Sequence, residues 1–233
     1  MNKFWIVMAA ALASQSALAV TLDFEGFSTG QIIDDEYAPA VSISALNFSD
    51  GPDVAVVFDT ENPTGGDLDL AGPFSSPDGE ISQNYRPGSV LIIQERNNCN
   101  FGSGFCNEAD DEGSRPGGQF SFVFANPITL QSLDFFDIEV EEADMAASQI
   151  RLFDEFDNEI LPGTFFVPNT GGDNQWNQLI FGDIGGVSRL EVNMAGSGAI
   201  DNLTYVPVPA AAWLFGSGLL GLWGLRRRSR PAD

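Results

Sequence analysis

Short apolar runs, separated by clusters of Gly, Pro, Asn and Asp, fill the chain between residues 20 and 206. Residues 119–124, Gln-Phe-Ser-Phe-Val-Phe, alternate polar and apolar side chains, as a half-buried antiparallel strand does. The runs are rich in Val, Ile and Phe, which favour strands. We therefore predict eleven short strands, at Thr21–Phe24, Val41–Phe48, Val54–Phe58, Val90–Glu95, Gln119–Phe124, Ser132–Val140, Gln149–Asp154, Gly163–Val167, Trp176–Phe181, Val187–Asn193 and Ala199–Val206.

This pattern predicts an all-β fold. No stretch between residues 20 and 205 offers a sustained helical stripe with caps, and only Val140–Gln149 suits a single helical turn. Eleven short strands in one domain favour an antiparallel β-sandwich of the jelly-roll type. The 19 phenylalanines of the chain suit the core of such a fold. Two long turn-rich segments, Asp59–Pro87 and Asn97–Gly118, interrupt the strands, and loops of this length are usually functional or disordered.

The N-terminal residues have the pattern of a secretory signal peptide. Lys3 supplies the positive charge, Phe4–Ala13 is apolar, and Ala17-Leu18-Ala19 is a small-x-small cleavage site. We therefore predict a signal peptide over residues 1–19 and export of the chain that follows.

The C-terminal residues 206–233 have the pattern of a membrane anchor. Pro207 and Pro209 precede an uncharged run, Ala210–Leu225. As a helix this run would be about 24 Å long, near the short limit for a bilayer core of roughly 30 Å. A basic cluster follows, and such clusters stay on the cytoplasmic side: Arg226, Arg227, Arg228 and Arg230. A C-terminal hydrophobic helix is the prediction, with the domain at residues 20–205 outside the cytoplasm.

The order of proline pair, apolar run and arginine cluster resembles the PEP-CTERM sorting signal of Gram-negative bacteria, in the variant Val-Pro-x-Pro-Ala-Ala-Ala-Trp-Leu-Phe-x-Ser-Gly-Leu-Leu-Gly. Val208 stands where the namesake motif has Glu. The resemblance implies sorting by an exosortase-like enzyme after a transient stay in the inner membrane. It also implies a final place on the cell surface or in an extracellular matrix of exopolysaccharide and biofilm. The alternatives are an ordinary anchor and a buried hairpin, and the arginines disfavour the hairpin.

The net charge of residues 20–205 limits the classes of molecule that this part of the chain can bind. This part holds five arginines, no lysine and 32 acidic residues, a formal charge of −27. Such a surface repels phosphates, which excludes nucleic acid as a partner. It attracts divalent cations, although solubility in a salty or calcium-containing medium explains the acidity equally well.

Two cysteines, Cys99 and Cys106, flank a Gly-Ser-Gly turn. In an exported protein this spacing predicts a disulfide that closes a small loop. The chain contains no histidine, which disfavours zinc and removes the commonest general base and the usual triads. Paired carboxylates remain available for glycoside hydrolysis, but no pair is marked out by its sequence context. We therefore predict a protein that is not an enzyme.

The first and last predicted strands carry the candidate metal ligands. Thr21–Gly26 and Ala199–Tyr205 resemble the first and last strands of galactose-binding-like jelly rolls and carbohydrate-binding modules. That resemblance implies a structural calcium shared by Glu25 and Asp201, with Asp23 as the alternate. Calcium takes six to eight oxygen ligands, so Asp67 and Asp69 in the long segment are candidates for the remainder.

Other acidic residues and one aromatic residue have two interpretations each. The run Asp110–Glu112 is either a second cation site or a solvated face, and solvation is the usual outcome. Asp137 and Glu139 share one strand face, which we expect to be wet. Trp176, the only Trp of residues 20–205, is either a platform for a sugar ring or a core residue.

Together these features predict an exported, non-enzymatic β-sandwich that binds calcium and polysaccharide at the cell surface or in the matrix. Two other functions stay open, a secreted glycan hydrolase with paired carboxylates and a ligand-free structural matrix protein. Binding to polysaccharides, measured beside hydrolysis of the same polysaccharides, distinguishes the three.

Overall fold

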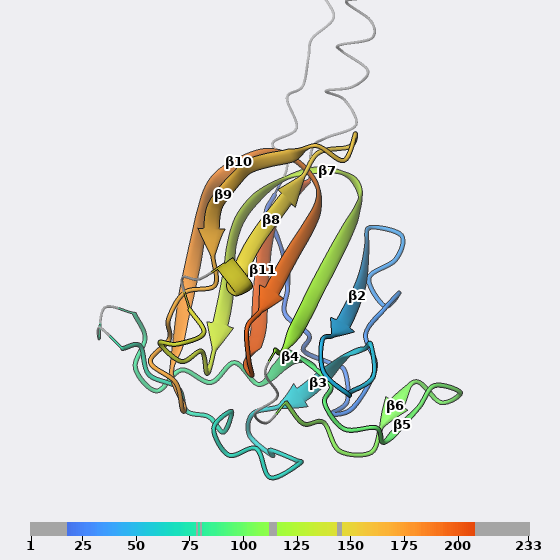
Figure 1. Ribbon diagram of the computed structural model, residues 1–233, viewed down its shortest axis with the longest axis vertical. Helices are drawn as coiled ribbons and strands as arrows, with labels where there is room; N and C mark the ends of the chain where they lie inside the picture. The colour runs from blue at the N-terminus through green and yellow to red at the C-terminus, as the bar shows by residue number, and fades with distance from the viewer. Residues whose placement is uncertain (1–17, 78, 80, 112–115, 144–145, 208–233) are drawn as a thin grey trace, which may run out of the picture. The chain divides into compact units, whose positions relative to one another are not determined.

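Eleven β-strands run through residues 20–207 of the computed structural model (Figure 1). The structure describes residues 18–77, 79, 81–111, 116–143 and 146–207. Within these ranges the one helical segment is a 3-10 turn, η1, at Ala146–Ser148. The strands are β1 (Val20–Leu22), β2 (Val41–Asn47), β3 (Ala55–Asp59), β4 (Ser89–Ile93), β5 (Cys99–Asn100), β6 (Phe105–Cys106), β7 (Gly118–Phe136), β8 (Gln149–Phe153), β9 (Glu159–Phe166), β10 (Trp176–Met194) and β11 (Ala199–Pro207).

Nine of these strands form one antiparallel sheet that folds over on itself. The order is β3-β4-β11-β7-β10-β8-β9, with β1 paired to β11 and β2 paired to β7. Residues 118–124 of β7 pair with β2 and with the second half of β10, whereas residues 128–136 pair with β11 and the first half of β10. Both long strands curve over at the upper end of Figure 1. The predicted all-β antiparallel sandwich is confirmed, and its two layers share β7 and β10.

The continuity of β7 and β10 differs from the prediction, which divided each of them into two short strands. In β7 the apparent break is Pro127, which lies where the partner changes from β2 to β11, so its missing N–H leaves no ladder hydrogen bond unmade. In β10 the break contains Gly182 and Gly186 with φ of 79° and 82°, and the register shifts there. These are bulges that bend a strand without ending it.

The layer that contains β3, β4 and β11 is buried on both faces. Val57 and Leu91 point into the main core between the two layers. Their neighbours Val56 and Ile92 point the other way, into a second core. The long segments after β3 and β6 cover that second core, to which they contribute Leu70, Phe74 and Ala109. Burial on both faces explains why β3 and β4 are continuous apolar runs rather than alternating ones.

The predicted disulfide between Cys99 and Cys106 is confirmed, and it closes the β5–β6 hairpin. The hairpin is also held by backbone bonds to the segment before β2. The Cys106 amide donates to the Gly30 carbonyl at 2.8 Å, and the Ile32 amide donates to the Gly104 carbonyl at 2.8 Å. The disulfide therefore orders a hairpin that already has a fixed place on the sheet.

Replacing both Cys99 and Cys106 with serine is expected to lower the free energy of unfolding by about 2.5 kcal/mol, the loop-closure term for a loop this short. The sequence separation of the two cysteines is 7. Urea denaturation of oxidised wild type and variant measures the difference. After reduction the two proteins should unfold at the same urea concentration, and a persistent gap would mean that the serines perturb packing instead.

The predicted terminal signals fall outside the described ranges. Residues 1–17 and 208–233 contain nearly all of the expected signal peptide, Pro209, the hydrophobic run and the arginines Arg226, Arg227 and Arg228. Pro207 is the last residue of β11. Residues 19–207 form one compact unit. Among the residues that the structure describes, no helix has the length and apolarity that crossing a membrane requires.

Candidate carboxylate sites and an aromatic pocket

Two aspartates face each other across β7 and β11. The register places Asp201 opposite Asp134, and their side chains are 1% and 3% exposed. The Asn202 side-chain amide donates to the Asp201 Oδ2 at 2.9 Å and to the Asp134 Oδ2 at 3.1 Å. The Gln178 amide donates to the Asp134 Oδ1 at 2.8 Å. The Oδ1 of Asp201 is buried without a hydrogen-bond donor. Two ionised carboxylates directly opposite each other would be destabilising, so this pair favours binding of a proton or a cation.

Asp23 and Glu25 bring more negative charge to the same place. Because Leu22 pairs with Leu203, the chain after β1 passes beside Asp201. Glu25 is exposed, and its Oε1 accepts a hydrogen bond from the Ser89 amide at 2.8 Å. Burial, and then repulsion from Asp134, Asp23 and Glu25, raises the pKa of Asp201 to about 9. Burial also raises the pKa of Asp134 to about 6. Glu25, Asp201 and the alternate Asp23 thus share one electrostatic neighbourhood.

Asp67 and Asp69 lie in a different neighbourhood from Glu25 and Asp201. Asp67 is 1% exposed, and its carboxyl contacts that of Asp111. Asp69 acts electrostatically on Asp137. The predicted calcium ligands thus fall into two groups. The reason is that the long segment after β3 folds over the second core and not toward β1 and β11.

Several acidic side chains that the sequence analysis expected to be solvated are buried. Asp110 and Asp111 are each 3% exposed, and Asp137 is 4% exposed. The expectation of a wet face was wrong for Asp137, because the covering loops close over the end of β7. Asp134 was missed as a partner of Asp201. Strand alternation alone does not distinguish a face turned toward solvent from one covered by a distant loop.

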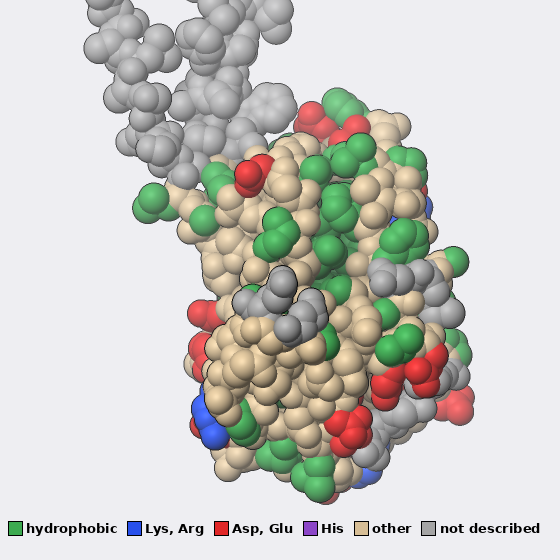
Figure 2. Space-filling view, turned by 90° about the vertical axis from the view of Figure 1, so that its left-hand side faces the viewer, with side chains coloured by type: hydrophobic (Ala, Val, Ile, Leu, Met, Phe, Trp, Pro, Cys, Tyr) green, Lys and Arg blue, Asp and Glu red, His purple; other side chains and the backbone are tan. Residues whose placement is uncertain are grey.

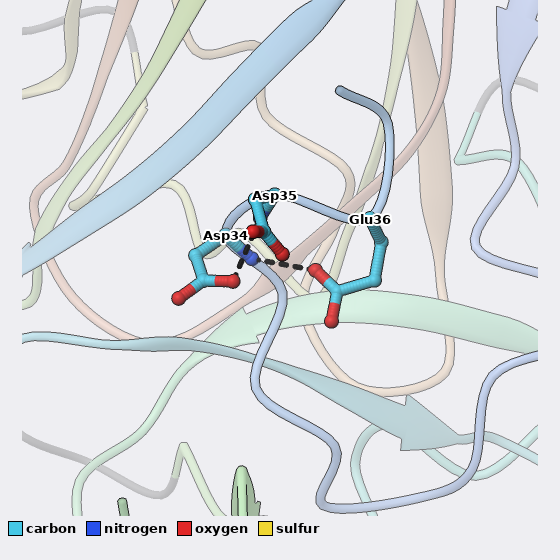
Figure 3. Close-up of side chains that lie close together, drawn as sticks. All are labelled: Asp34, Asp35 and Glu36. Atoms are coloured by element: carbon cyan, nitrogen blue, oxygen red, sulfur yellow. Dashed lines mark hydrogen bonds between the residues drawn. The ribbon is translucent and has the colours of Figure 1, made fainter. Parts of the chain in front are cut away.

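An exposed acidic triad lies before β2. Asp34, Asp35 and Glu36 place one carboxylate oxygen each within 4.8 Å of the others, the one such group among the described residues (Figure 3). The Asp34 amide donates to the Glu36 Oε2 at 2.8 Å, and the Asp35 amide donates to the Asp34 Oδ1 at 2.7 Å. All three residues are exposed. Local turn hydrogen bonds account for the convergence, and exposed acidic groups are common without an ion.

Beside this triad the β5–β6 hairpin forms one wall of an open pocket. The pocket encloses about 540 Å³, including solvent at its mouth. Phe101 is 68% exposed and Phe105 is 39% exposed, and Asp34 and Glu36 also line the pocket. Sequence reasoning found the cysteine loop but not this pocket, because Asp34 and Glu36 lie more than sixty positions before Phe101.

Trp176 is an interior residue of the second core. Its side chain is 6% exposed, and its Nε1 donates to the Ser82 carbonyl at 3.1 Å. Its ring lies 4.4 Å from that of Tyr85 and 6.3 Å from that of Phe136, measured between centroids. A sugar platform needs an exposed ring face, so the burial of Trp176 favours the core interpretation over the carbohydrate-binding one.

The charged side chains of the domain are predominantly acidic. Figure 2 shows acidic side chains in several separate groups over one face, with few basic side chains between them. All four arginines that the structure describes form ion pairs with carboxylates: Arg86, Arg96, Arg151 and Arg189. Their charges are therefore already compensated within the domain, and they do not form a basic patch.

Comparison with known proteins gives distant structural similarities. No protein-family model and no curated protein matches the sequence. A fucose-binding module of Streptococcus pneumoniae aligns with 49% of this chain and 78% of its own, at 18% identity and a TM-score of 0.27. The enzymatically active domain of tailspike protein 4 of bacteriophage CBA120 aligns with 73% of this chain and 20% of its own, at 12% identity and a TM-score of 0.32. At these TM-scores neither likeness supports a functional assignment.

Proposed function

We propose that this protein is an exported, non-enzymatic β-sandwich that binds polysaccharide and calcium at the cell surface or in the extracellular matrix. In this proposal residues 206–233 are the sorting signal, read by an exosortase-like enzyme during transient residence in the inner membrane. The observation that carries the binding function is the pocket between the disulfide hairpin and the acidic triad.

The pocket combines the two kinds of group that sugars need. The exposed rings of Phe101 and Phe105 offer apolar faces to the C–H face of a pyranose, and the Asp34 and Glu36 carboxylates accept hydrogen bonds from hydroxyls. The Gln31 side chain adds both donor and acceptor capacity. Few polar groups beside apolar rings are typical of a small-ligand site.

Binding fits this pocket better than hydrolysis does. A glycosidase needs one carboxylic acid whose pKa is raised by its surroundings, commonly by burial. Asp34, Asp35 and Glu36 are all exposed. The chain has no histidine to act as an alternative acid or base. These features favour recognition of a glycan without cleavage.

The calcium part of the proposal rests on Asp201. Its Oδ1 is buried and lacks a hydrogen-bond donor, and Glu25 and Asp23 add charge beside it. Calcium accepts irregular sets of oxygen ligands that include backbone carbonyls and water. An ion here would join the first strand of the domain to the last, because β1 pairs with β11.

Replacing Phe101 with alanine is expected to weaken polysaccharide binding about tenfold, which corresponds to about 1.4 kcal/mol, a typical value for one exposed aromatic contact. Isothermal titration calorimetry with the polysaccharides that bind best on a glycan array measures the change. Phe156→Ala is the matched control, because Phe156 is 77% exposed and lies on the β8–β9 turn.

Three outcomes decide between the candidate functions. Equal binding by wild type and Phe101→Ala would place the glycan site elsewhere. Absence of binding to every polysaccharide would favour a ligand-free structural protein. Release of reducing ends from a bound polysaccharide, lost on replacement of one carboxylate, would identify a hydrolase and overturn the non-enzymatic proposal.

A further inference from the structure

A second group of buried carboxylates lies beneath the long loops. Asp67 lies in the segment after β3, Asp111 lies in the segment after β6, and Asp137 directly follows β7. Their side chains are 1%, 3% and 4% exposed. Each of the two segments that cover the second core thus contributes one buried aspartate near the end of β7.

The contacts of these acids leave oxygen atoms without donors. The Asp111 Oδ2 accepts a hydrogen bond from the Gly198 amide at 2.8 Å, and the Asp67 Oδ1 accepts one from the Leu70 amide at 3.2 Å. The Oδ2 of Asp67 and the Oδ1 of Asp137 are buried and have no hydrogen-bond donor. Yet the Asp67 carboxyl lies at hydrogen-bonding range of the Asp111 carboxyl.

Gly198 ties Asp111 to the end of β7. Its φ is 126°, and a Cβ built on it would lie 3.3 Å from the carbonyl oxygen of Asp137 and 2.9 Å from that of Phe136. Two main-chain carbonyl oxygens therefore approach the residue whose amide binds Asp111. Backbone carbonyls beside carboxylates are the mixture of oxygen ligands that calcium uses.

Two ionised carboxylates cannot hydrogen-bond to each other, because both only accept. A shared proton or a cation between Asp67 and Asp111 would make this contact favourable. Among the residues described, no ion pair reaches Asp67, Asp111 or Asp137. A proton shared by Asp67 and Asp111 leaves one negative charge on the pair, whereas a divalent ion compensates both charges, and buried charges without compensation are costly.

We propose that Asp67 and Asp111 are direct ligands of a divalent cation, calcium, which clamps the two covering segments to the end of β7. Backbone carbonyls and water supply the remaining oxygens, and Asp137 adds negative charge close by. We assign only two carboxylates as ligands because, in the described part of the chain, only the surface triad brings three of them within 4.8 Å. Oxygen ligands alone favour calcium over zinc, and the irregular set disfavours magnesium, which demands an octahedron.

This centre is separate from the one proposed at Asp201. The carboxylates that act on Asp201 include Asp134, Asp23 and Glu25. The two sites have no proposed ligand in common, so each can be removed by substitution without replacing a ligand of the other.

Calcium titration of the full-length protein after removal of metal with EDTA tests the proposal. Calcium at a hundredfold excess over its dissociation constant should raise the melting temperature of the wild type by roughly 5–10 °C for each site. Magnesium at equal ionic strength should do much less. Asp111→Asn keeps an oxygen for the Gly198 amide but removes a charge. It should bind one calcium ion fewer by elemental analysis, and without metal it should melt above the wild type.

Two matched variants make the result specific. Asp35→Asn, in the exposed triad, should change neither the number of bound ions nor the calcium-dependent shift. Asp201→Asn should lose its own ion and keep the one held by Asp67 and Asp111. If Asp111→Asn does not fold, the same measurements on Asp67→Asn test the same cation site.

Two results would overturn the inference. One is a wild type whose melting temperature does not change when calcium is added. The other is an Asp111→Asn or Asp67→Asn protein that still binds as many calcium ions as the wild type. Glycan binding is measured separately with Phe101→Ala, so loss of this site and failure of the pocket proposal give different results.

Discussion

Replacing Phe136 with alanine is expected to lower the free energy of unfolding by about 3–5 kcal/mol, the usual cost of deleting a fully buried Phe side chain. Phe136 is the last residue of β7 and is 0% exposed. Its ring lies 4.9 Å from that of Phe74 and 6.0 Å from that of Tyr85, both in the segment that covers the second core. The cavity would therefore open between the sheet and its covering loop.

Urea denaturation followed by circular dichroism measures this change. Phe156→Ala is the control, since a ring that is 77% exposed should contribute less than about 0.5 kcal/mol. Amide hydrogen exchange should also accelerate around Phe74 and Tyr85 more than in β2, which packs only in the main core. Equal effects of the two alanine substitutions would mean that the covering segment does not depend on the second core.

Without calcium, the stability of the protein is expected to fall as the pH rises from about 5 to about 9. Burial raises the pKa of Asp134 to about 6, of Asp137 to about 8 and of Asp201 to about 9. An unfolded aspartate has a pKa of about 3.9. Between these values the folded state binds more protons than the unfolded state, so stability decreases as the pH rises. The summed loss should be of the order of several kcal/mol.

Urea denaturation at pH 5, 7 and 9, in EDTA and in calcium, measures this dependence. In calcium the stability should depend less on pH, because a bound ion compensates the buried carboxylates that otherwise bind protons. Asp201→Asn in EDTA should lose less stability between pH 7 and pH 9 than the wild type does. A wild type that becomes more stable from pH 5 to pH 9 in EDTA would show that the buried aspartates are compensated in some other way.

Features that depend on residues close together in the chain were predictable from the sequence. The alternation over residues 119–124 indicated a strand, and these residues lie in β7. The disulfide followed from two cysteines on either side of a short turn, because a chain that reverses in so few residues brings both ends together. The proximity of Glu25 to Asp201 was predicted in a different way, from the resemblance of the first and last strands to known sandwiches. The pairing of these two strands was not derivable from the local sequence pattern.

Features that depend on which distant segments meet were decided by the tertiary structure. The period of a strand shows which side chains share a face, but not whether solvent or another segment covers that face. Asp137 and Trp176 are buried because the segments after β3 and β6 close over the end of β7 and the start of β10. The same closure brings Asp67 to Asp111, more than forty positions apart. Backbone hydrogen bonds to Gly30 and Ile32 hold the hairpin of Phe101 beside the segment that carries Asp34. Such contacts arise because apolar side chains on both faces of β3 and β4 must be buried, and only the fold determines which residues bury them.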